Sequence, residues 1–217
     1  MQEKIGILGS GMVCQALCKG FIELGYEVKI GSRTPGKLNE LIISLNSNKV
    51  SSGNLNETAQ FGDIIFFCVK GTEIENAINL ADKENFSNKI IVDVSNPLLF
   101  KEEGKAPTLS ASYPNSNGKK IQELIPDAKV VKAFNTIPAH YMCAPHLEEG
   151  TPTFFICGND QESKRIIENI ARKFEWEDVI DLGDIEQSYL LETLAMIYII
   201  YGFNNNYWNH AFKLLRK

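Results

Sequence analysis

Residues 5–14 read Ile-Gly-Ile-Leu-Gly-Ser-Gly-Met-Val-Cys, and this stretch decides the fold. The apolar residues 5–8 have the length of a buried strand, and a glycine ends them. From Met12 onward the apolar residues recur with a helical period, and Gly25 stands where helices commonly end. A second apolar run, 26–30, has the length of another strand. The chain therefore opens with strand, glycine turn, helix and strand, which is the βαβ unit of a parallel sheet.

The same alternation of apolar runs and helical stretches continues downstream. It predicts an α/β protein of the Rossmann type, in which helices cover both faces of a doubly wound, mostly parallel sheet. We expect residues 1–183 to form this domain. We expect residues 184–217 to form a C-terminal helical segment that packs on the sheet domain or at the seam of a homodimer. Further strands are expected at 64–69, 90–94, 129–134, 153–157 and 179–180, and helices at 12–24, 34–45, 73–81, 121–125, 160–174 and 184–201.

Composition excludes several classes of protein. The 217 residues are 44% hydrophobic and 23% charged, as in an ordinary globular chain. Lys and Arg number 22 and Asp and Glu 27, so the formal net charge is −5 and nonspecific nucleic-acid binding is not expected. The five cysteines include no C-x-x-C pair, so we predict neither a disulfide framework nor a metal site. Because there is no signal peptide and the most apolar stretch, 190–203, is too short to span a bilayer, we expect a cytoplasmic protein without membrane contact.

The glycine turn predicts a dinucleotide site. Gly9 and Gly11 are the first two glycines of a G-x-G-x-x-G motif, and Cys14 replaces the third. The first glycine permits a tight turn, the second lets a pyrophosphate approach the backbone, and the third position requires only a small residue. The unpaired N–H groups at the helix start favour a phosphate. The alternative is that the two glycines form a tight turn without a ligand.

The end of the second predicted strand favours NADP(H) over NAD(H). A site for NAD usually carries an acidic residue there, which holds the ribose hydroxyls. This chain has Ser32 and Arg33 instead, with Lys37 following. An arginine pairs with the 2′-phosphate of NADP(H), whereas a carboxylate would repel it. The alternative is that Arg33 and Lys37 are solvated residues at the start of a helix.

Three further segments follow strands at the predicted carboxyl edge of the sheet, where ligands of parallel sheets bind. They are Val69-Lys70-Gly71, Ser95-Asn96-Pro97 and Asn135-Thr136-Ile137-Pro138. Their polar side chains and prolines predict that together they line a nicotinamide pocket. Taken singly, each segment is equally consistent with an ordinary loop turn.

Five segments occur in an order that resembles a known family. They are residues 6–11, 31–33, 93–97, 130–135 and 156–160. They resemble the NADP-dependent deazaflavin-coenzyme oxidoreductases, and equally the cytosolic oxidoreductase domain of the STEAP-type metalloreductases. The resemblance covers nearly the whole chain. It implies an enzyme, an NADPH-dependent oxidoreductase that transfers a hydride between NADP(H) and a small-molecule acceptor such as a flavin or deazaflavin.

The resemblance also implies which residues contact the cofactor. No catalytic side chain is assigned, because hydride transfer between ring systems needs little acid–base help. The deazaflavin reductases are expected to have a histidine at the position of Asn135, so the acceptor stays open. The implied contacts are Gly9, Ser10, Gly11, Met12 and Val13 for the pyrophosphate, Ser32, Arg33 and Lys37 for the 2′-phosphate, and Val69, Lys70, Asn96, Pro97, Asn135 and Ile137 for the nicotinamide side.

Two other functions stay open at this stage. A non-catalytic NADP(H)-binding regulatory protein would need the same glycine turn but no acceptor. An imine or carbonyl reductase of the pyrroline-carboxylate reductase type also opens with a G-x-G turn. Reductases of that type usually carry a longer helical dimerisation domain than residues 184–217.

Overall fold

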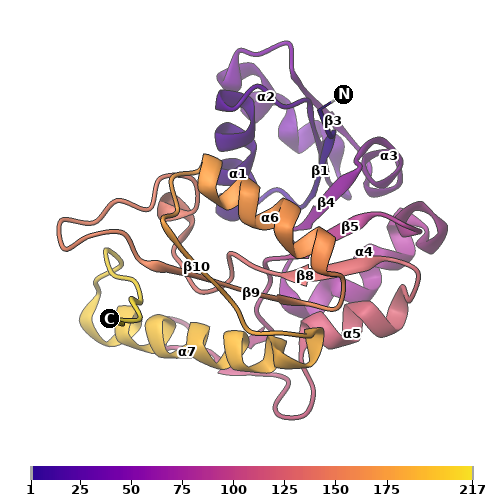
Figure 1. Ribbon diagram of the computed structural model, residues 1–217. Coiled ribbons are helices and arrows are strands. Elements are labelled where there is room, and N and C mark those ends of the chain that lie inside the picture. The colour runs from indigo at the N-terminus through magenta and orange to yellow at the C-terminus, as the bar shows by residue number, and fades with distance from the viewer. Residues whose placement is uncertain (1, 217) are drawn as a thin grey trace.

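A computed structural model describes residues 2–216, in which eight strands form one sheet with helices on both faces (Figure 1). The strand order is β10-β9-β8-β5-β4-β1-β2-β3. The strands are β1 (Ile5–Leu8), β2 (Val28–Gly31), β3 (Val50–Gly53), β4 (Ile64–Phe67), β5 (Ile90–Asp93), β8 (Lys129–Lys132), β9 (Thr153–Gly158) and β10 (Asp178–Asp181), with a separate hairpin of β6 (Leu98–Leu99) and β7 (Thr108–Leu109). The α-helices are α1 (Met12–Glu23), α2 (Asn39–Leu45), α3 (Leu55–Phe61), α4 (Ile74–Ala81), α5 (Asn117–Leu124), α6 (Gln161–Lys173) and α7 (Ser188–Asn205).

The predicted fold class is confirmed. Neighbouring strands in the large sheet run parallel, except that β9 is antiparallel to β8. Strand β1 lies between β2 and β4, and Leu8 stands opposite Gly31 on one side and Phe67 on the other. The carboxyl ends of these three strands therefore meet at one edge of the sheet, directly before the glycine turn.

One strand of the large sheet and one α-helix escaped the sequence prediction, as did the two short strands of the separate hairpin. Strand β3 lies at the edge of the sheet and contributes only one apolar residue, Val50, so it lacks an apolar run. Helix α3 is short, but its start carries a capping box. The Asn54 side chain accepts a hydrogen bond from the Glu57 N–H at 2.8 Å, and Glu57 accepts one from the Asn54 N–H at 2.9 Å. This Asn-x-x-Glu spacing is a helix-start signal that the sequence already contained.

The sheet separates two hydrophobic clusters, one on each face. Under α1 and α6, the buried Phe21 ring packs edge-on against Tyr26, Phe66 and Phe174 with centroid distances of 5.4, 5.0 and 5.1 Å. Such aromatic pairs contribute about 0.5–1.5 kcal/mol each beyond the area they bury. Helices α3, α4 and α5 cover the other face. The two layers hold the carboxyl edge of the sheet rigidly.

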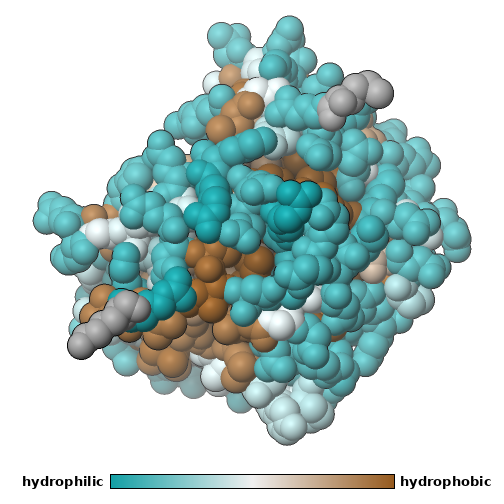
Figure 2. All heavy atoms as spheres, viewed as in Figure 1, coloured by the Kyte–Doolittle hydropathy of each residue, from teal (hydrophilic) through white to brown (hydrophobic). Residues whose placement is uncertain are grey.

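Helix α7 lies along one side of the molecule, and the chain after it turns back toward β9 (Figure 1). The Thr153 N–H donates to the Phe212 carbonyl at 2.9 Å, which fixes this return. Hydrophobic residues gather on the surface over α7 (Figure 2), where Ile197 and Tyr201 are exposed. Across residues 2–216 no helix combines the length and apolar character needed to cross a membrane. The domain boundary at residue 184 and the dimer seam stay predictions.

Candidate functional site

The two glycines of the turn differ in what the chain itself requires of them. Gly9 has φ +142°, and a Cβ there would lie 2.5 Å from the Cys68 carbonyl oxygen, so only glycine fits. Gly11 has an ordinary φ of −83°, and a Cβ there would meet nothing within 4 Å. Gly11 precedes α1, whose first turn has no side-chain cap in the described chain. The space over Gly11 is therefore free for a ligand, next to unpaired helix N–H groups.

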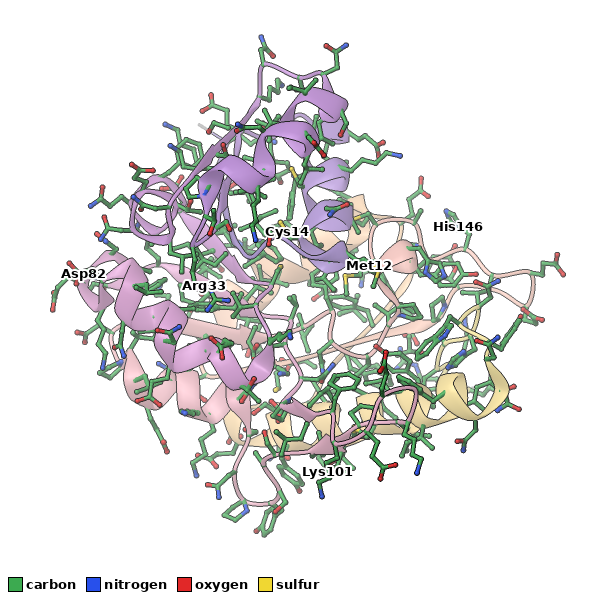
Figure 3. The ribbon with its side chains drawn as sticks, turned by 180° about the vertical axis from the view of Figure 1, so that it is seen from behind. Met12, Cys14, Arg33, Asp82, Lys101 and His146 are labelled. Carbon is green, nitrogen blue, oxygen red and sulfur yellow. The ribbon has the colours of Figure 1, made fainter. Side chains whose placement is uncertain are left out.

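A cavity of about 380 Å³ extends from this turn to the end of β2. The structure brings seven of the predicted site residues together in its wall. Lys37 is exposed in the turn Pro35–Leu38, and Met12 is 80% exposed at the start of α1 (Figure 3), so neither lines this cavity. The seven are Gly9, Ser10, Gly11, Ser32, Arg33, Val69 and Lys70.

Helices α3 and α4 complete the cavity, and sequence reasoning missed this contribution. Leu55, Ala77 and Leu80 supply an apolar wall, and Glu73 and Asn76 supply polar groups. The apolar period of α4 predicted a helix but not which of its residues would reach the edge of the sheet. Cys68 also lines the cavity, and burial raises the pKa of its thiol well above the ordinary value, so the thiol stays neutral.

Arg33, labelled in Figure 3, is one of the two basic residues in the wall of this cavity, with Lys70. Its guanidinium Nη1 lies 3.4 Å from Oε2 of Glu73. Both side chains are substantially exposed, 67% for Arg33 and 42% for Glu73. Water competes for both groups, so the pair is weak and Arg33 can change partner.

The loops after β5 and β8 meet through a reciprocal pair of asparagines. The Asn96 Nδ2 donates to the main-chain carbonyl of Asn135 at 2.9 Å. Because that carbonyl can only accept, Asn96 must present its Oδ1 to the Asn135 Nδ2, which donates at 2.9 Å. The side-chain Oδ1 of Asn135 is then buried without a partner among the described residues. A buried acceptor of this kind is costly unless a donor satisfies it, so this Oδ1 is the atom of the pair that a donor group of a ligand could satisfy.

Pro97 and Ile137, the predicted neighbours of these asparagines, are buried in the same two loops. Val13 is half-buried in the first turn of α1. These three residues and the asparagine pair do not line the cavity at the glycine turn. The structure therefore gathers eleven of the fourteen predicted residues into two groups, seven around the cavity and four around the asparagine pair, and leaves Met12, Val13 and Lys37 outside both.

A buried charge cluster lies beside the asparagine pair, and the sequence analysis did not foresee it. The Lys132 Nζ lies 2.7 Å from Oδ2 of Asp93 and 2.8 Å from Oε1 of Glu192. All three side chains are at most 2% exposed. The Lys132 Nζ also donates to the Ser95 carbonyl at 2.5 Å. The cluster therefore fixes the start of the Ser95–Pro97 loop and anchors α7, which carries Glu192, to the sheet.

The two carboxylates and the burial act on the pKa values in this cluster. Burial opposes the charge on Lys132, but the two carboxylates outweigh it and raise the pKa of the ammonium. Burial raises the pKa of Glu192, Lys132 lowers it, and the nearby charge of Asp93 raises it again, so the pKa lies above its ordinary value. Asp93 and Lys132 are register partners at the ends of neighbouring strands. A charged residue at the carboxyl end of each of these two strands was the signal that could have revealed the pair.

Asn117 extends the cluster to the loop after β4. Its main-chain N–H donates to Oε1 of Glu192 at 2.8 Å. Its side-chain Nδ2 donates to the Gly71 carbonyl at 3.1 Å and to Oγ of Ser95 at 2.9 Å. The loops that follow β4 and β5 are thus held by one connected set of polar contacts. Within residues 2–216, no group of three or more His, Cys, Asp or Glu residues is placed to hold a metal ion.

Comparisons with known proteins agree with this geometry. The family model described as "NADP oxidoreductase coenzyme F420-dependent" matches residues 4–97. A crystal structure of a provisionally assigned F420-dependent NADP reductase from Arthrobacter sp. FB24 has a TM-score of 0.92 and 32% identity, covering 99% of this chain and 100% of that one.

One curated relative and one solved structure are less similar to this chain. The rat metalloreductase STEAP3 (Rattus norvegicus) is 30% identical over 193 residues, which are 89% of this chain. The chain spans only 36% of the length of that curated relative. A reductive aminase from Aspergillus terreus, solved with NADPH, has 18% identity and a TM-score of 0.66, covering 95% of this chain and 63% of that one. That likeness shows a common fold alone.

Proposed function

The chain belongs to the family of coenzyme F420-dependent NADP oxidoreductases, and from this premise we propose that it transfers a hydride between NADP(H) and a flavin or deazaflavin acceptor. The open space over Gly11 carries the proposal. The chain's own packing does not require a glycine there, whereas a pyrophosphate that must reach the backbone does. Because the cavity continues from this turn to Arg33, one dinucleotide can occupy both ends.

The adenosine half of NADP(H) fits the cavity residues. Gly9, Ser10 and Gly11, with Met12 and Val13 at the helix start, would hold the pyrophosphate through main-chain N–H groups. Ser32 and Arg33, with Lys37 nearby, would hold the 2′-phosphate. The adenine would lie against the apolar wall of Leu55, Ala77 and Leu80.

The nicotinamide half fits the group around the asparagine pair. The unpartnered Oδ1 of Asn135 would accept a hydrogen bond from an amide or hydroxyl of the cofactor. Asn96, Pro97 and Ile137 would surround the ring, with Val69 and Lys70 between the two halves of the site. When bound, the nicotinamide supplies or receives the hydride. The protein's part is to hold the ring in place and to exclude water, and no side chain is assigned as a proton donor.

The acceptor in this proposal rests on the family and on the Arthrobacter relative. The likeness to the reductive aminase concerns the fold alone, so it does not favour an imine reductase. A non-catalytic regulator would bind NADPH without consuming it. Following the absorbance of NADPH with no acceptor, with free flavin and with a deazaflavin separates these functions. We expect consumption that depends on one of the two acceptors; tight binding without consumption would favour the regulator.

Arg33→Ala tests the assignment of the cofactor. We expect the Kd for NADPH to rise at least about tenfold while the Kd for NADH changes little, because only NADPH carries the 2′-phosphate. Isothermal titration calorimetry with both nucleotides measures this. Arg165→Ala is the matched control, since Arg165 is an exposed arginine on α6 that pairs with Glu162, outside the cavity. Equal losses for the two nucleotides would contradict the preference for NADP(H).

A further inference from the structure

Glu73 places a carboxylate inside the proposed cofactor cavity, facing Arg33. Its Oε2 lies 3.4 Å from Nη1 of Arg33 and accepts a second hydrogen bond from Nδ2 of Asn76 at 3.3 Å. Among the residues that the structure describes, Arg33 is the ion-pair partner of Glu73 and no other basic group pairs with it. The group that would recognise a 2′-phosphate is therefore already paired with a negative charge.

The turn that carries Glu73 is fixed by its surroundings. Its N–H donates to the Lys70 carbonyl at 2.8 Å, and Glu73 directly precedes α4, where the helix dipole favours a negative charge. Gly71, in the same turn, approaches the Asn96 carbonyl so closely that a Cβ would lie 2.2 Å from that oxygen. The Asn117 Nδ2 also donates to the Gly71 carbonyl. The backbone thus holds Glu73 at the wall of the cavity.

We propose that Glu73 is a specificity-determining residue that opposes Arg33 and lets the site accept NAD(H) as well as NADP(H). This inference rests on the proposed function. A 2′-phosphate carries close to two negative charges, so it must take Arg33 from Glu73 and then lie beside a carboxylate that repels it. A free 2′-hydroxyl can instead donate a hydrogen bond to the Glu73 carboxylate. Acidic residues hold the ribose in NAD sites through a hydrogen bond of this kind.

The exposure of Arg33 and Glu73 limits the expected change in nucleotide affinity. Both side chains are exposed to solvent, so the interaction of Glu73 with Arg33 and with the nucleotide is screened and small. For Glu73→Gln we expect the Kd for NADPH to fall about two- to fivefold and the Kd for NADH to rise by a similar factor. The ratio of the two constants then changes roughly tenfold. Because glutamine keeps the shape and a hydrogen-bond acceptor, Arg33 and Asn76 keep a neighbour, and a loss of packing does not confuse the result.

The experiment measures both dissociation constants by isothermal titration calorimetry for wild type, Glu73→Gln and Glu75→Gln. Glu75 is the matched control: it lies two residues further along the chain, in the first turn of α4, pairs with Lys120 at 2.8 Å and does not line the cavity. Its substitution removes the same charge and should leave the ratio within about twofold. Repeating the titrations in 0.5 M salt should shrink the effect of Glu73→Gln, because the Debye length falls to a few ångströms.

An unchanged ratio in Glu73→Gln would overturn the inference. Weaker NADPH binding in that variant would also overturn it, because Glu73 would then be supporting Arg33 rather than opposing it. Wild-type protein that binds neither nucleotide would overturn the proposed function together with this inference. Wild-type protein that binds NADPH, with a ratio that Glu73→Gln does not move, would overturn this inference alone.

Discussion

Two of the sites where a basic residue meets carboxylate groups among residues 2–216 serve different purposes. At the cavity, Arg33 faces Glu73 at 3.4 Å with both side chains exposed. Beside the asparagine pair, Lys132 lies 2.7 and 2.8 Å from two carboxylates, and all three side chains are at most 2% exposed. Water weakens the first pair, so Arg33 can change partner when a ligand arrives. Removing one member of the cluster around Lys132 would leave a buried charge uncompensated, so its three side chains stay together. That cluster therefore holds the loops in place.

Removing the cation from each cluster tests this contrast and should give the largest effect. Lys132→Met leaves two buried carboxylates without their ammonium, so we expect the free energy of unfolding to fall by about 3–5 kcal/mol. Arg33→Met removes an exposed cation and should cost less than about 1 kcal/mol. Urea denaturation followed by circular dichroism measures both. Similar losses in the two variants would show that burial does not separate the clusters.

A substitution in the glycine turn should have a smaller effect, and it separates ligand binding from stability. Gly11→Ala adds a methyl group to space that the chain does not fill, so we expect unchanged stability and a Kd for NADPH at least about tenfold higher. Gly36→Ala is the control, because its Cβ would also meet nothing within 4 Å and Gly36 lies outside the cavity. Calorimetry and thermal unfolding of the two variants measure binding and stability separately. Unchanged NADPH binding in Gly11→Ala would mean that the turn is only structural.

The cavity at the glycine turn contains most of the site residues that the sequence could predict. Gly9, Gly11 and Arg33 are recognisable because their roles depend on local features: a strand before them, a helix after them and a fixed spacing. The strands of the sheet are recognisable for the same reason, as apolar runs. Helix α4 was predicted too, but Glu73 was not recognised as a cavity residue. The place of Glu73 in the cavity wall depends on how the start of α4 packs against the carboxyl edge of the sheet. No local sequence pattern predicts that packing.

The buried cluster could not be predicted in the same way. Lys132 meets a carboxylate 39 residues before it and another 60 residues after it, so the contact exists only when the strand order is known. Glu192 lies in the most apolar stretch of the chain, residues 190–203, and no local pattern in that stretch indicates which residue it pairs with. Strand β9 had the composition of its parallel neighbours, and its antiparallel direction follows from the path of the chain between β8 and β9. These features depend on topology rather than on residue type.

The pH dependence of Glu192→Gln gives the smallest and most specific test of the buried cluster. Burial raises the pKa of Glu192 above its ordinary value of 4.5, so the folded state binds this proton more tightly than the unfolded chain does. The stability that this group contributes is therefore fully present below pH 4.5 and is lost as the pH rises through the raised pKa. The variant lacks this titration, so the stability of wild type relative to Glu192→Gln should increase as the pH falls from 8 to 5.

The change in this stability difference cannot exceed about 1.4 kcal/mol per pH unit for one proton. Urea denaturation of both proteins at several pH values measures it, and a difference that stays constant or reverses would show that Lys132 compensates both carboxylates fully.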